Sequence, residues 1–70
     1  MNWIAQIINH LNSRGTSLAD ANEIVFSYIE SDKELAYILN CQEYQGTLTN
    51  EKIEFVIDDL YEWSYNRLKS

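Results

Sequence analysis

The sequence predicts an all-α fold, a small compact bundle of three or four antiparallel helices. Apolar residues recur at i, i+3, i+4 and i+7 along the chain, and helix-capping residues separate these stretches. The 70 residues include no proline and only two glycines, which suits helices joined by short turns. Short connections favour antiparallel neighbours. At this length we expect a single helical domain spanning residues 1–70.

The first expected helix covers about residues 2–13, and Gly15 can adopt the left-handed conformation that ends it. Its predicted inner face consists of Ile4, Ile7, Ile8 and Leu11. A second helix is expected to begin at Thr16 or Ser17. Phe26 lies at the flank of its inner face, which is predicted to carry Leu18, Ala21, Ile24, Val25, Tyr28 and Ile29.

A third helix is expected to open at Ser31, with Glu34 in the capping-box position and Gly46 at its end. Its apolar stripe is narrow and consists of Leu35, Ile38 and Leu39. The alternative is that the second and third segments form one bent helix.

The fourth expected helix has the strongest pattern. Thr49 caps a run over about residues 50–68, with Trp63 at the margin of the buried side. At about 100° per residue, the predicted inner face carries Ile53, Val56, Ile57, Leu60, Ser64 and Leu68.

Charge is unevenly distributed along the chain. All 11 acidic residues lie between Asp20 and Glu62, where Lys33 and Lys52 are the only bases, so this stretch carries a net charge of −9. Such a field repels phosphate backbones and anionic lipid and attracts basic partners. We therefore expect no direct nucleic-acid binding and no membrane association. Ordinary solubility is the alternative explanation of the charge.

Two further observations predict a cytoplasmic location. The N-terminal residues lack the basic and apolar regions of a signal peptide, and no stretch approaches the ~20 apolar residues of a membrane span. Cys41 is the only cysteine, and a lone thiol fits a reducing compartment.

The chain offers little catalytic chemistry. His10 and Cys41 could in principle form a base and a nucleophile, and paired carboxylates are a further alternative that the sequence leaves open. One histidine with one cysteine are too few for a zinc site. There is no glycine-rich phosphate loop and no calcium-loop spacing of carboxylates. We predict that the protein is not an enzyme and binds no cofactor and no metal.

The candidate partner-binding residues lie mainly on the outward face of the fourth helix. Its acidic residues follow i, i+3 or i+4 spacing, flanked by tyrosines, and Phe55 is placed almost opposite the inner face. On the third helix, two tyrosines seven residues apart face outward. Aromatic residues surrounded by charge are typical of interaction hot spots. The candidate set is Glu51, Glu54, Phe55, Asp58, Tyr61, Glu62, Tyr65, Tyr37 and Tyr44. Two alternatives place Phe55 inside the monomer or in a homodimer interface.

These features predict a small acidic protein-binding module that inhibits or sequesters a basic partner, one that itself acts on nucleic acid. The alternative is a structural or regulatory homodimer. The residues 34–37, Glu-Leu-Ala-Tyr, and the acidic fourth helix are similar in style to bacterial immunity proteins that neutralise nuclease toxins, and to small phage-encoded inhibitors. The chain lacks the twin tyrosines and proline of that family's third-helix motif, so no binding residue is transferred.

Overall fold

Four helices make up most of the chain in the computed structural model, which describes residues 2–69 and side chains as far as residue 67. They are α1 (Trp3–Ser13), α2 (Leu18–Ser31), α3 (Lys33–Gln45) and α4 (Asn50–Lys69). No strand occurs within residues 2–69. The predicted small all-α bundle is confirmed, while the predicted inward position of Leu68 lies outside the side chains described.

Local side-chain caps explain where three of the helices begin. The Asn2 carboxamide accepts a hydrogen bond from the Ile4 amide, and the Ser17 hydroxyl accepts one from the Asp20 amide. The Thr49 hydroxyl accepts in the same way from the Lys52 amide. At the other end of α3, Gly46 has a φ of 77°, a left-handed conformation that residues with a Cβ rarely adopt. The sequence indicated the Ser17, Gly46 and Thr49 signals correctly.

The boundary between α2 and α3 is a single residue, Asp32. Its φ of −147° and ψ of 76° break the helix, and its carboxylate accepts a hydrogen bond from the Leu35 amide at 3.1 Å. The prediction that Ser31 opens the third helix was therefore wrong by one residue. Ser31 ends α2, and its hydroxyl donates to the Tyr28 carbonyl oxygen at 2.6 Å. The second and third segments are separate helices.

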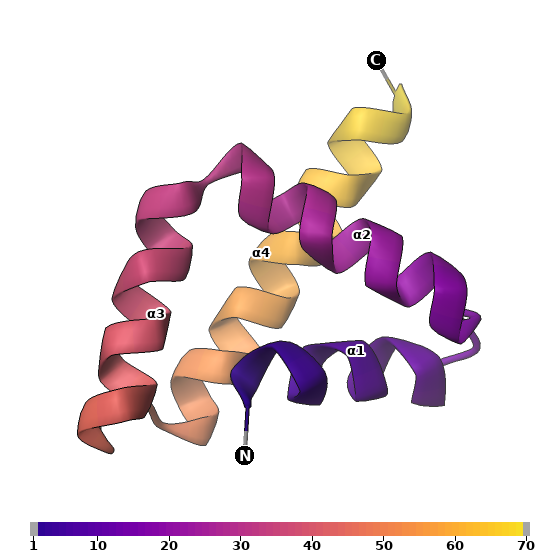
Figure 1. The fold of residues 1–70 in the computed structure, drawn as a ribbon. Helices are drawn as coiled ribbons and strands as arrows, with labels where there is room; N and C mark the ends of the chain where they lie inside the picture. Colours follow the sequence, from indigo (N-terminus) through magenta and orange to yellow (C-terminus); the bar gives the residue numbers. More distant parts are fainter. Residues whose placement is uncertain (1, 70) are drawn as a thin grey trace.

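The helices cross at several angles (Figure 1). α1 and α2 form an antiparallel pair, and α3 turns sharply away from α2. α4 runs diagonally behind α1 and α2. α1 and α2 each pack against the other three helices, whereas the Cα atoms of α3 and α4 stay more than 8 Å apart throughout the described residues. The last turns of α4 project beyond α2.

The core draws side chains from all four helices. In α1 the buried residues are Trp3, Ile7 and Leu11, at i, i+4 and i+8. Trp3 was missing from the predicted inner face, although this spacing could have identified it. Its indole nitrogen donates a hydrogen bond to the Asn40 side-chain oxygen at 2.7 Å, which joins α1 to α3. The other buried residues are Ala21, Val25, Tyr28, Ala36, Leu39, Val56, Ile57 and Leu60.

Two residues assigned to inner faces are exposed instead. Leu18 is 55% exposed, and it is the first residue of α2. Ile38 is 42% exposed because α3 turns Ala36 and Leu39 toward the core. The predicted apolar stripe of α3 was therefore wrong in including Ile38, because the residue buried together with Leu39 is Ala36.

Candidate protein-binding surface

The outward face of α4 carries four carboxylates. α4 buries Val56, Ile57 and Leu60, and each residue turns the helix by about 100°. Side chains on the opposite side therefore face solvent. The four acidic residues there are all exposed, and we call them the acidic stripe: Glu51, Glu54, Asp58 and Glu62.

No base in the described part of the chain is paired with the acidic stripe. Among the described residues, its four carboxylates form no ion pair. The ion pair that the structure does show lies elsewhere, between Lys33 and Glu30 at 3.5 Å. Like charges three or four residues apart on a helix repel one another by a few tenths of a kcal/mol per pair. The stripe therefore keeps a repulsion that positive charges from outside the chain would relieve.

Phe55 is exposed beside the acidic stripe. Its side chain is 66% accessible, which excludes the alternative that Phe55 packs inside the monomer. The Lys52 ammonium lies 5.5 Å from the centre of its ring, a cation–π distance. Tyr61 and Tyr65 are also exposed on this side of the helix. The sequence thus placed these aromatic side chains correctly at the surface.

One margin of the acidic stripe borders α1. A hollow there is lined by His10 and Arg14 from α1 and by Glu54, Ile57, Asp58 and Tyr61 from α4. The His10 ring lies edge-on to Tyr61, with 6.4 Å between ring centres. His10 therefore belongs to this margin, and in the described part of the chain it is not hydrogen-bonded to Cys41 on α3.

The two predicted tyrosines of α3 form a separate surface. Tyr37 is 70% and Tyr44 is 94% exposed, on the side of α3 opposite Leu39. Because the backbones of α3 and α4 do not approach each other, the structure does not join this pair to the acidic stripe by a helix contact. The nine candidate residues are all exposed but are divided between two helices.

Asp59 differs from its neighbour Asp58. Its carboxylate turns toward α2 and accepts a hydrogen bond from the Tyr28 hydroxyl at 2.6 Å. Burial of the phenol, followed by this hydrogen bond and the negative charge of Asp59, raises the pKa of Tyr28 above its ordinary value. Sequence reasoning missed this contact because the two residues are 31 positions apart. Asp59 therefore supports the fold, and Asp58 faces solvent.

In comparisons with known proteins, no family model, curated protein or solved structure matches this chain. Within the described residues, the His, Cys, Asp and Glu side chains do not gather into any group of three that could hold a metal ion. None of the helices in residues 2–69 combines the length and apolar character needed to cross a membrane.

Proposed function

We propose that this chain is an acidic protein-binding module that blocks or sequesters a basic partner, itself a protein that acts on nucleic acid. The observation that supports this most directly is the acidic stripe, which forms no ion pair with any described residue and lies beside the exposed ring of Phe55. Surfaces that bind nucleic acid are rich in lysine and arginine because they neutralise phosphates. A row of carboxylates can compete for the same side chains.

Charge and aromatic area would contribute to different stages of binding. The net charge of −6 and the acidic stripe would steer a basic protein toward α4 and speed its association. Phe55 and Tyr61 would then lose water against the partner and supply most of the affinity, as aromatic residues do in interface hot spots. The module would need no catalytic group, since covering the partner's basic surface is sufficient to block it.

Charge reversal on α4 tests the proposal. Capture from the native host on the immobilised protein would supply the partner, and stopped-flow mixing would give association rates. We expect Asp58→Lys combined with Glu54→Lys to slow association about tenfold at low salt and to flatten its salt dependence. Glu34→Lys, on the exposed first turn of α3, is the control for a charge change elsewhere and should have a smaller effect. An association rate indifferent to salt and to both α4 substitutions would refute the electrostatic role.

The exposure of Phe55 also favours a second candidate function, a homodimer with Phe55 at the symmetric contact. Sedimentation of the wild-type protein over a dilution series separates the two. A monomer at micromolar concentration supports the binding module. A dimer that dissociates when Phe55 is replaced by alanine supports the homodimer.

A further inference from the structure

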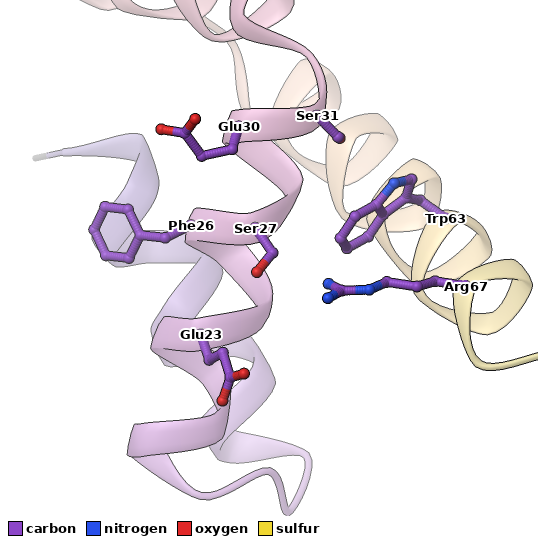
Figure 2. A pocket seen from close by; sticks show the side chains of 7 residues that line it. All are labelled: Glu23, Phe26, Ser27, Glu30, Ser31, Trp63 and Arg67. Carbon is purple, nitrogen blue, oxygen red and sulfur yellow. The ribbon is translucent and has the colours of Figure 1, made fainter.

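A second surface lies between α2 and the C-terminal half of α4, away from the acidic stripe. Figure 2 shows Trp63 and Arg67 of α4 pointing toward Ser27 of α2. Glu23 and Glu30 lie one turn before and one turn after that serine. Because the serine side chain is small, it leaves a hollow between the longer side chains around it. Phe26 borders the hollow on the side away from α4.

This hollow continues along α2 into another one. Glu23, Trp63 and Arg67 line both hollows, and the second also reaches Thr16 and Asp20. We call the combined surface the α2–α4 groove. From Thr16 to Ser31 it follows about 15 residues, which corresponds to roughly 22 Å at 1.5 Å per helical residue. The α2 side could therefore follow a partner helix of about four turns, whereas on the α4 side the lining residues span about one turn, from Trp63 to Arg67.

The two sides of the groove differ in chemistry. Its apolar surface comes from Phe26, which is 52% exposed, and from the half-buried Ile24 and Trp63. On the α2 side it carries three carboxylates, those of Asp20, Glu23 and Glu30. Arg67 adds one positive charge on the α4 side. Carboxylates next to apolar side chains on α2 are the complement of an amphipathic helix that carries the opposite charge.

Two cations of the chain itself, Arg67 and Lys33, lie beside side chains of this groove. The Arg67 guanidinium lies 5.4 Å from the centre of the Trp63 ring, a cation–π arrangement. Lys33 pairs with Glu30, but both side chains are about three-quarters exposed, and such pairs contribute little because water screens them. Three carboxylates (Asp20, Glu23 and Glu30) stand against two cations (Lys33 and Arg67), so the groove keeps a net charge of −1 toward a partner.

We propose that the α2–α4 groove is a second docking site, and that its occupant is a basic amphipathic helix of a protein partner. Trp63 follows Glu62 in α4 and is turned about 100° from it, toward α2. The groove and the acidic stripe thus face different directions. Docking in the groove does not depend on the stripe, and either proposal can fail alone.

A synthetic peptide of about 14 residues, with leucines on one helical face and lysines on the rest, is a suitable probe. Its binding can be followed through tryptophan fluorescence, because Trp3 is buried and Trp63 is the residue that a quencher such as acrylamide reaches. We expect the peptide to protect Trp63 from quenching at 0.1 M salt. A scrambled peptide of the same composition and a version with glutamate in place of lysine should each bind at least tenfold more weakly.

Two pairs of substitutions with the same change in net charge localise the binding. Glu23→Lys with Glu30→Lys should weaken it at least tenfold, whereas Glu54→Lys with Asp58→Lys should change it less than threefold. Phe26→Ala removes an exposed ring without disturbing the core, and should weaken binding severalfold. Circular dichroism would verify that each variant keeps its helices.

Several results would overturn the groove proposal. One is peptide binding that is lost with the α4 substitutions and retained with the α2 substitutions, because the acidic stripe would then be the site. Equal binding of the scrambled peptide would show charge attraction without a groove. Protection of Trp63 that rises with protein concentration in the absence of peptide would identify a second copy of this chain as the occupant.

Discussion

The phenol of Tyr28 connects α2 to α4 at the scale of single residues. Its hydroxyl donates to Asp59 at 2.6 Å, and its ring meets Trp63 edge-on with 5.5 Å between ring centres. Burial is the largest cause that raises its pKa, followed by the hydrogen bond to Asp59 and the negative charges of Asp59 and Asp32. An ionised phenol at this position would lose water and face a carboxylate, so the folded protein favours the neutral form.

This pKa shift predicts a loss of stability in alkali. Above about pH 10 the unfolded chain releases the Tyr28 proton while the folded chain keeps it, so the free energy of unfolding falls as pH rises. Tyr28→Phe removes this titration and should make the fall less steep. At about pH 7 it should cost about 1 kcal/mol, for the lost hydrogen bond. Urea unfolding at several pH values measures both effects. Tyr44→Phe should follow the wild type, and equal slopes for Tyr28→Phe and wild type would contradict the prediction.

At the scale of helices, Asp32 determines how α2 becomes α3. The same residue ends one helix through its amide, which donates to the Ile29 carbonyl oxygen, and starts the next through its carboxylate. The sequence analysis named only Ser31 as the cap, although Asp32 beside it is also a residue type that caps helices. The backbone break at Asp32 decides between them, because Ser31 is still the last residue of α2 and its hydroxyl donates to the Tyr28 carbonyl oxygen.

Asp32→Ala should therefore lower the free energy of unfolding by about 1 kcal/mol, the usual cost of removing an N-cap acceptor. Asp32→Ser keeps an oxygen that can accept from the Leu35 amide and should recover most of that loss. Ser31→Ala removes only a bond to a carbonyl oxygen within α2 and should cost less than Asp32→Ala. Urea midpoints give the comparison. A larger loss for Ser31→Ala would show that Ser31 is the cap.

At the scale of the whole molecule, charge repulsion acts across the full fold. The principal dimensions are 35 × 24 × 19 Å. At 0.01 M salt the screening length is about 30 Å, so charges on opposite ends of the molecule still interact. At 0.1 M it falls to about 10 Å, which is shorter than any of these dimensions. The electrostatic repulsion among the acidic side chains should then be much weaker.

We therefore expect the protein to become more stable as salt rises from about 0.01 M to about 0.1 M. A gain of about 1 kcal/mol would raise Tm by roughly 4–8 °C for a chain of this size. Thermal unfolding in sodium chloride at neutral pH measures it. Glu54→Lys with Asp58→Lys lowers the net negative charge, so its Tm should respond less to salt. A wild-type Tm that falls with added salt would refute dominant self-repulsion.

The sequence by itself determined the helices and the exposure of the candidate residues on α4. Caps such as Ser17 and Thr49 act on amides three residues away, and the left-handed glycine at Gly46 acts on its own turn. The helical period placed Phe55 opposite Leu60, and the ring is indeed at the surface. All of these features depend on interactions within one helix, and therefore on residues that are close in sequence.

Only the tertiary structure decided which helix faces meet. Trp3 is bonded to Asn40 across 37 positions and Tyr28 to Asp59 across 31, and no periodic pattern specifies such pairs. The burial of Ala36 in place of Ile38, the separation of α3 from α4 and the α2–α4 groove likewise follow from how the helices cross. Crossing angles depend on side-chain packing between segments distant in sequence, and the period of a single helix contains no information about its neighbours.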